Sequence, residues 1–187
     1  MRIIGGKLKG RVINLPLHFE ARPTTDFAKE GLFNVLQNEM DFTGMSMLDL
    51  FSGSGSISAE FISRGAEECV CVEMNRTNAA QLKKTFLTLG IKNAKTVHCN
   101  VFYFLEICSR SFDVIFADPP YKLQGLDTIP DRVLSKTFSE NGTDCPILKK
   151  GGYFILEHPA EYNFSGHTNF VKEKKYGNVH FSFFTIL

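Results

Sequence analysis

The chain has 187 residues, of which 43% are apolar and 22% are charged, and its formal net charge is +1. This balance excludes a disordered chain, and no apolar run approaches the ~20 residues that a membrane-spanning helix needs. The first residues contain no apolar signal-peptide core, so we expect a cytoplasmic protein that folds around one main core.

The cysteines indicate neither a disulfide framework nor a metal centre. Their number is odd and no two of them are spaced as CxxC, so we expect buried free thiols and no bound metal. The five positions are Cys69, Cys71, Cys99, Cys108 and Cys145.

Positive charge is concentrated at the N-terminus. Residues 1 to 22 contain five basic groups and a single acid, Glu20, which gives this segment a net charge of +4, while the remaining residues sum to −3. A basic arm on a near-neutral body predicts a polyanionic partner such as RNA. The alternative is that these charges only keep an exposed hairpin soluble.

The N-terminal 40 residues are predicted to form an extension. Residues 2–4 and 11–14 flank the sequence GGKLKG, and glycines at both ends of a short basic loop favour a β-hairpin. A helix is predicted to start within residues 23–26, where Pro23, Thr24, Thr25 and Asp26 are typical helix-start residues, and to end at about Gln37. We therefore divide the chain into an N-terminal extension of hairpin plus helix (1–40) and a main domain (41–187).

From Met45 onward, strand and helix patterns alternate, which is typical of a mostly parallel, doubly wound α/β sheet with helices on both faces. The predicted strands are 47–51, 68–73, 95–99, 112–117 and 152–156, followed by a closing hairpin of 170–174 and 180–186. The predicted helices are 56–64, 76–89, 101–108 and 126–139.

The first candidate site is the glycine-rich turn in LDLFSGSGS, where a strand leads into a helix. Gly53 and Gly55 allow a tight turn and close approach of a ligand to the backbone. Asp49 would repel a pyrophosphate, whereas Glu73, at the end of the next strand, can hold two ribose hydroxyls. The pattern favours a cationic, phosphate-free nucleoside, S-adenosylmethionine (AdoMet). Alternatively, both acids are solvated strand ends.

Asn100 ends the third predicted strand, near the position expected for the adenine ring of such a cofactor. Its side chain could accept a hydrogen bond from the adenine amino group. An equally simple interpretation is an asparagine that stabilises a turn.

The second candidate site is the tetrapeptide DPPY after the strand 112–117. Two prolines hold the backbone of Asp118 extended and make the loop stiff. The Asp118 carboxylate and the Pro119 carbonyl could accept hydrogen bonds from a planar exocyclic amine, while Tyr121 stacks on the base. A dry turn built on Pro119 and Pro120 is the alternative.

Together, DLFSGSG, the strand-ending Glu73 and DPPY resemble class I AdoMet-dependent amino-methyltransferases. The segments RIIGGKLKGR, RPTTD, LFN, LEHP and KKYGN further resemble the RsmD family of bacterial 16S ribosomal RNA guanine-N2 methyltransferases. The resemblance implies a seven-stranded sheet with an antiparallel last strand. It also implies AdoMet as methyl donor and, as partner, 16S ribosomal RNA within the small ribosomal subunit; we expect a monomer.

The site residues that follow from the motifs and the resemblance form three groups. The expected catalytic residues are Asp118, Pro119, Pro120 and Tyr121. The expected cofactor-binding residues are Asp49, Phe51, Gly53, Gly55, Glu73, Met74, Asn100 and Val101. The expected RNA-binding residues are Arg2, Lys7, Lys9, Arg11, Arg22 and Thr24.

The chain departs from the family pattern at two positions. Lys29 stands where relatives often have arginine, which could weaken a contact that needs a bidentate guanidinium group. Asn100 stands where many have aspartate. Two other functions share parts of the pattern and stay open: a DNA adenine-N6 or cytosine-N4 methyltransferase, and a non-catalytic RNA-binding module for ribosome assembly.

Overall fold

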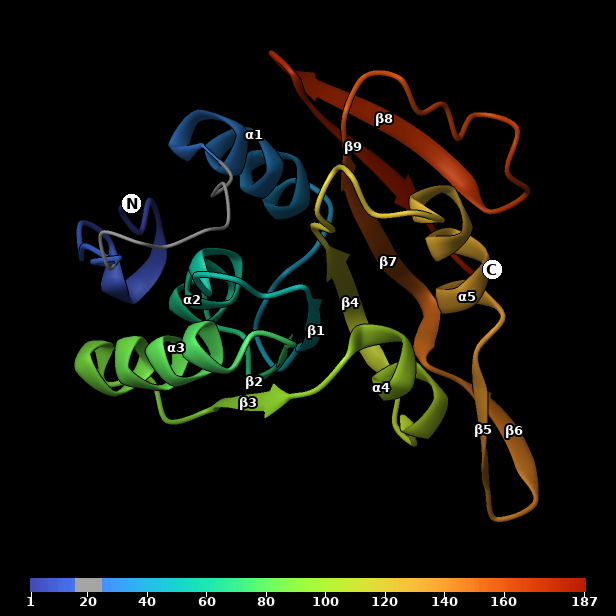
Figure 1. The fold of residues 1–187 in the computed structure, drawn as a ribbon, viewed down its shortest axis with the longest axis horizontal. Coiled ribbons are helices and arrows are strands. Elements are labelled where there is room, and N and C mark those ends of the chain that lie inside the picture. Colours follow the sequence, from blue (N-terminus) through green and yellow to red (C-terminus); the bar gives the residue numbers. More distant parts are fainter. Residues whose placement is uncertain (16–24) are drawn as a thin grey trace.

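A seven-stranded sheet forms the centre of the computed structural model, which describes residues 1–15 and 25–187 (Figure 1). The strand order is β3-β2-β1-β4-β7-β9-β8, and β9 runs antiparallel to the other six strands. This confirms the predicted sheet with an antiparallel last strand. The strands are β1 (Ser46–Leu50), β2 (Glu68–Glu73), β3 (Ala94–His98), β4 (Phe112–Ala117), β7 (Leu148–His158), β8 (Phe170–Tyr176) and β9 (Val179–Phe184).

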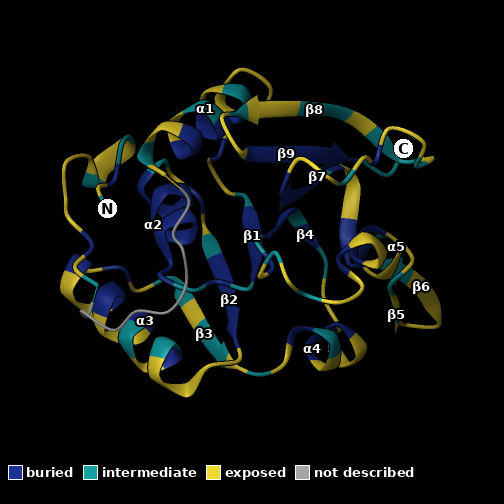
Figure 2. Cartoon of the chain, turned by 45° about the horizontal axis from the view of Figure 1, so that its top comes forward, coloured by how far each residue is buried: buried dark blue, intermediate teal, exposed yellow. Residues whose placement is uncertain are grey.

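Helices cover both faces of the sheet (Figure 2). One face packs against α1 (Asp26–Gln37), α2 (Ser56–Ser63) and α3 (Arg76–Leu89). The other packs against α4 (Val101–Ile107), η2 (Leu126–Thr128) and α5 (Ile129–Leu134). Because both faces are covered, β1 is buried throughout, with Met47 in one core and Leu48 and Leu50 in the other. No helix in the described ranges is both long and apolar enough to cross a membrane.

The helix predicted over 126–139 is wrong beyond Leu134. There the chain enters a two-stranded antiparallel sheet, β5 (Thr137–Glu140) and β6 (Thr143–Pro146). Asn141 and Gly142 connect the strands, both with positive φ (53° and 78°), as the tight hairpin turns of Asn-Gly pairs require. The sequence signal was therefore present at Asn141-Gly142. In addition, β7 begins at Leu148, four residues before the predicted strand.

The predicted N-terminal hairpin is present but short. Its antiparallel bridge, between Arg2 and Val12, is held by backbone hydrogen bonds from the Ile3 N–H to the Arg11 carbonyl and from the Ile13 N–H to the Met1 carbonyl, both at 2.9 Å, and it encloses the short 3₁₀ helix η1 (Gly6–Leu8). Side chains of α2 also bind the backbone of this segment. The Glu60 carboxylate accepts hydrogen bonds from the N–H groups of Ile4 and Gly5, both at 2.7 Å. The segment is therefore held to the main body by buried polar contacts rather than by strand pairing.

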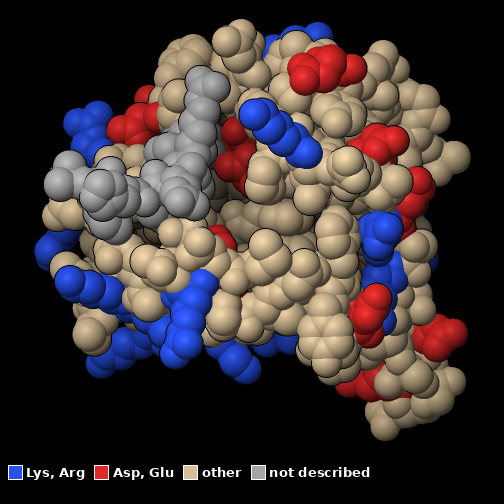
Figure 3. Space-filling view, viewed as in Figure 1, with Lys and Arg blue, Asp and Glu red and all other residues tan. Residues whose placement is uncertain are grey.

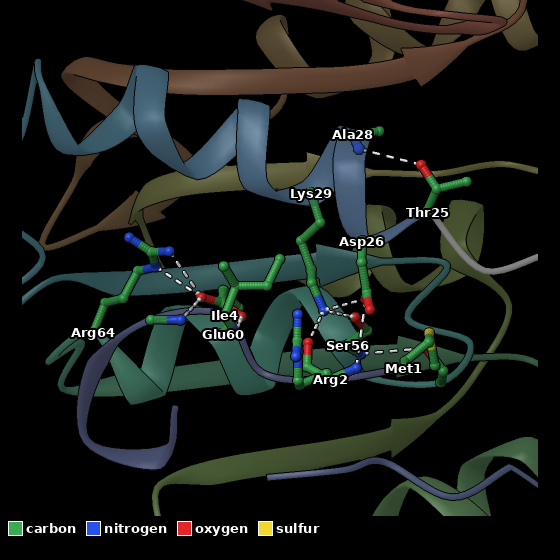
Figure 4. Close-up of polar contacts among 12 residues, drawn as sticks. Met1, Arg2, Ile4, Thr25, Asp26, Ala28, Lys29, Ser56, Glu60 and Arg64 are labelled. Carbon is green, nitrogen blue, oxygen red and sulfur yellow. Dashed lines mark hydrogen bonds and ion pairs between the residues drawn. The ribbon is translucent and has the colours of Figure 1, made fainter. Parts of the chain in front are cut away.

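Lys29 on α1 joins this segment to α2 (Figure 4). Its ammonium group, fully buried, donates to the Arg2 carbonyl at 2.7 Å and to the Ser56 hydroxyl at 2.9 Å. Asp26 lies 3.5 Å from the same nitrogen. Burial lowers the pKa of Lys29, and the nearby Glu60 and Asp26 carboxylates oppose that shift. A lysine ammonium group is a compact charge with three N–H donors, so it suits three oxygen atoms that come from three segments.

Apolar contacts accompany these polar ones. Ile3 and Ile13 are buried in the same core cluster as Leu32 of α1 and Phe61 of α2. The division of the chain near residue 40 stays a prediction.

We expect Lys29→Ala to destabilise the protein by about 2–4 kcal/mol, because it opens a cavity and leaves the Arg2 carbonyl and the Ser56 hydroxyl without this donor. Urea denaturation measures the loss, and hydrogen exchange at Ile3 and Ile13 should accelerate. Lys150→Ala, which removes an exposed lysine at the start of β7, should stay within about 0.5 kcal/mol of the parent. Equal stability of the two variants would contradict the role given to Lys29.

Candidate functional site

A cavity of about 650 Å³ opens at the carboxyl ends of β1, β2, β4 and β7. The strand order reverses between β1 and β4, and crevices at such points are the usual ligand sites of doubly wound sheets. All the predicted catalytic and cofactor-binding residues except Gly55 line this cavity: Asp49, Phe51, Gly53, Glu73, Met74, Asn100, Val101, Asp118, Pro119, Pro120 and Tyr121.

The glycine-rich turn has the backbone shape that its sequence predicts. Gly53 and Gly55 have φ values of 48° and 72°, and Phe51 between β1 and the turn also lies in the left-handed region, at 64°. A bulky residue with positive φ is uncommon and clusters at functional sites. Gly55 caps α2 rather than facing the cavity, and a Cβ on it would lie 2.1 Å from Leu82.

Glu73 holds the turn against the end of β2. One of its carboxylate oxygens accepts from the Gly53 N–H at 2.9 Å, and the other accepts from the Asn75 N–H at 2.7 Å. Each oxygen retains a further lone pair for a ligand hydroxyl.

Asp49 is a buried acid on β1, with only 2% of its surface exposed. The Ser58 hydroxyl of α2 donates to its carboxylate at 2.5 Å. Burial raises the pKa of Asp49 to about 7, the neighbouring Glu73 adds to the rise, and the bond from Ser58 opposes it. Near neutral pH this group can therefore gain or lose a proton in response to a bound charge.

The DPPY loop continues from β4 with Asp118 half-buried at the cavity wall. Burial raises the pKa of Asp118 well above its usual range, and the negative charges of Glu157 and Asp49 raise it further. The Tyr121 hydroxyl donates to Glu157, at 3.4 Å. Glu157 sits on β7 and is 3% exposed, so a second buried carboxylate faces the loop.

The charges around the cavity are of one sign. Among the described residues that line it, four are carboxylates (Asp49, Glu73, Asp118 and Glu157) and none is lysine, arginine or histidine. Like charges so close together are costly, and a cationic ligand would relieve that cost.

Asn100 caps α4. Its carbonyl oxygen accepts from the N–H groups of Phe102 and Tyr103, at 2.9 and 3.3 Å, and its amide lies 3.4 Å from the Met74 sulfur. The turn-stabilising interpretation is thus present in the structure, and the adenine contact stays a prediction.

Sequence reasoning missed Glu157, Ser58 and Thr25 as site residues. Glu157 had a signal, since it lies near the end of a strand as Glu73 does, within the LEHP segment. Ser58, in the place where a dinucleotide fingerprint has its third glycine, reaches Asp49 only because α2 packs on β1. Thr25 lines the cavity through the packing of α1, which no local pattern reveals.

The four predicted RNA-binding residues that the structure describes do not line the cavity. Arg2, Lys7, Lys9 and Arg11 are exposed on the N-terminal segment, and Arg22 and Thr24 fall outside the described residues. Two lysines near the C-terminus are paired with acids: Lys172 with Glu39, and Lys175 with Glu173.

Comparisons with known proteins agree with this geometry. The family model described as "Conserved hypothetical protein 95" matches residues 1–185. The chain is 31% identical to ribosomal RNA small subunit methyltransferase D of Buchnera aphidicola subsp. Baizongia pistaciae, over 98% of this chain and 91% of that protein. It is 38% identical to the Escherichia coli K12 protein of that name, over 65% of this chain and 61% of that protein.

Solved structures share the whole fold. The structure of the Escherichia coli protein yhhF has a TM-score of 0.81 at 29% identity, covering 99% of this chain and 97% of that one. A hypothetical protein of Thermus thermophilus has a TM-score of 0.84 at 26% identity, covering 100% of this chain and 99% of that one.

Gly55 allows a prediction with a matched control. Gly55→Ala and Gly90→Ala both introduce a Cβ at positive φ (72° and 71°), which costs about 1–2 kcal/mol. At Gly55 the Cβ also meets Leu82, whereas at Gly90 it has nothing within 4 Å. We expect Gly55→Ala to be less stable than Gly90→Ala by about 1–3 kcal/mol in urea denaturation. Equal losses would show that the packing under Gly55 yields without cost.

Proposed function

Because the chain belongs to the family of ribosomal RNA small subunit methyltransferase D, we propose that it methylates the exocyclic N2 amine of a guanine in 16S ribosomal RNA. The methyl donor is AdoMet. The observation that carries the proposal is the DPPY loop at the wall of a cavity lined by four carboxylates and, among the residues described, no basic side chain.

The residues around the cavity fit AdoMet. Its ammonium and sulfonium groups are positive and it has no phosphate, so the four carboxylates attract it and would repel a dinucleotide. When bound, AdoMet supplies a methyl carbon that its sulfonium makes electrophilic. The cavity volume also lies within the range of small-molecule sites.

We assign each cofactor-binding residue by its position and chemistry. Asp49 and the backbone around Gly53 would hold the amino-acid end. Glu73, whose oxygens are fixed by two backbone N–H groups, would accept from the ribose hydroxyls. Met74 and Val101 would pack on the adenine ring near Asn100.

The DPPY loop would hold the acceptor amine. The amine nitrogen of guanine is a weak nucleophile because its lone pair is delocalised into the ring. Hydrogen bonds from the NH₂ group to the Asp118 carboxylate and the Pro119 carbonyl would localise that lone pair and aim it. Pro119 and Pro120 keep these acceptors from turning away, which avoids an ordering cost.

Tyr121 would orient the base by stacking, and Glu157 would hold the tyrosine ring through its hydroxyl. A cation bound in the cavity would favour the ionised form of Asp118. Because the pKa of Asp118 is raised, that ionised form is a stronger base than an ordinary carboxylate and can take the proton that the methylated amine loses. From Asp118 that proton can pass to solvent at the open side of the cavity.

The Asp49 pKa near 7 predicts a pH-dependent affinity for AdoMet. Binding a cation requires the ionised carboxylate, so below pH 7 the proton on Asp49 must leave, and affinity should fall by up to about tenfold per pH unit. Above pH 7 the affinity should level off. Calorimetry between pH 5.5 and 8.5 measures the profile and the proton released.

Two variants control this experiment. Asp49→Asn should bind AdoMet more weakly and lose this part of the pH dependence. Ser58→Ala removes the hydrogen bond that lowers the pKa of Asp49, so its midpoint should move to higher pH. Identical profiles for the parent and Asp49→Asn would contradict the assignment of Asp49.

The activity itself can be tested with radiolabelled AdoMet. Small subunits lacking the modification, naked 16S ribosomal RNA and duplex DNA serve as acceptors, followed by digestion to nucleosides. We expect label in N2-methylguanosine and none in DNA. Label in DNA adenine or cytosine, or binding of RNA without transfer, would contradict the proposal.

Asp118→Ala is the matched inactive variant in the same assay. It should bind AdoMet with near-parental affinity and lose at least about 100-fold in turnover, because the amine loses its charged acceptor. Asp144→Ala, an exposed acid on β6, should be unaffected. Turnover of Asp118→Ala within a few-fold of the parent would exclude Asp118 as the acceptor.

A further inference from the structure

A second basic segment follows β2. Residues 74–105 contain no aspartate or glutamate, and they carry five cations: Arg76, Lys83, Lys84, Lys92 and Lys95. The net charge of +5 over this segment exceeds the +4 of residues 1–22, in a chain whose total is only +1. We call these five side chains the α3 surface.

The fold brings the five cations to the outside at one edge of the molecule. Helix α3 buries Ala79, Leu82, Thr85, Phe86 and Leu89 against the sheet, and Arg76, Lys83 and Lys84 are exposed on its other side. Lys92 and Lys95 are exposed just before and on β3, the edge strand beside it. Figure 3 shows basic side chains gathered at the lower left, where Figure 1 has α3 and β3.

The charges of the α3 surface are uncommitted within the described part of the chain. No ion pair there involves any of the five, whereas Lys149, Lys172, Lys175, Arg64 and Arg110 each pair with an acid. Exposed lysine and arginine side chains raise the local positive potential. Because they need not break an ion pair first, their contact with a polyanion costs little free energy.

Helix α3, which carries three of the five cations, contacts both the cavity and the N-terminal segment. Asn75 and Asn78, at the start of α3, line the cavity. In the middle of the helix, the Gln81 amide donates to the carbonyl of Asn14 at 3.3 Å. A polyanion that entered the cavity with one base would therefore meet α3 and then the basic N-terminal segment.

We propose that the α3 surface binds phosphates of the ribosomal RNA on one side of the target guanine. The inference rests on the proposed function for the identity of the RNA. It assigns the larger part of the electrostatic attraction to α3 and β3, and it leaves out Lys172 and Lys175, whose charges are neutralised by Glu39 and Glu173. RNA fits better than an acidic protein, since the surface adjoins a cavity suited to a nucleobase.

The test compares two pairs of adjacent lysines. Lys83→Gln/Lys84→Gln removes two charges from the α3 surface. Lys149→Gln/Lys150→Gln removes two exposed charges at the start of β7, the opposite end of the strand from Glu157. The affinity for unmodified naked 16S ribosomal RNA is measured by filter binding at several salt concentrations, with melting temperature and AdoMet affinity as checks on folding.

We expect the Lys83/Lys84 variant to lower the slope of log K against log salt by about 1.4–1.8, as the loss of two phosphate contacts predicts. The β7 pair should keep the parental slope. Equal slopes for both variants, or a parent that does not bind the RNA, would overturn the inference.

The same samples separate this inference from the proposed function. If the Lys83/Lys84 variant has the flattened slope while the parent binds RNA but transfers no methyl group, the role of the α3 surface stands and the proposed activity is contradicted. If the parent transfers the methyl group and the Lys83/Lys84 variant keeps the parental slope, the proposed activity stands and the role of the α3 surface is contradicted.

Discussion

Four carboxylates around one cavity, without a basic side chain among the described lining residues, are the constraint on which the site depends. Desolvation and mutual repulsion both disfavour their charged forms, as the raised pKa values of Asp49 and Asp118 reflect. The protein offsets part of this cost with the Ser58 hydroxyl and the backbone N–H groups on Glu73. The part of the electrostatic cost that stays uncompensated favours a cationic ligand, which is the physical basis for AdoMet as donor.

Buried charged side chains also fix the N-terminal segment. Glu60 and Lys29 are fully buried, and their charged groups form hydrogen bonds with backbone groups of Ile4, Gly5 and Arg2. Backbone hydrogen bonds within the segment, between residues 1–3 and 10–13, add to these contacts. Because Lys29 also holds Ser56 at the cavity wall, the basic segment and the cofactor site share one support.

The charge of the molecule is thus divided between inside and outside. Acids gather in the cavity, and exposed cations that form no ion pair with another described residue lie on α3, on β3 and on the N-terminal segment. A net charge of +1 conceals this arrangement. Such a division suits an enzyme that draws a polyanion to its surface while holding a small cation within, since the two attractions act at different depths.

The sequence by itself determined the sheet and the motif residues that line the cavity, because strand, glycine turn and DPPY are local patterns that parallel topology brings to one edge. It also contained two signals that went unused, Asn141-Gly142 and the acid-free segment 74–105. Only the tertiary structure decided that Gly55 packs on Leu82, that Lys29 and Glu60 bind the backbone of the N-terminal segment, and that Ser58 and Glu157 join the site. Those contacts link residues far apart in the chain or on separate elements, and packing alone determines which of them meet.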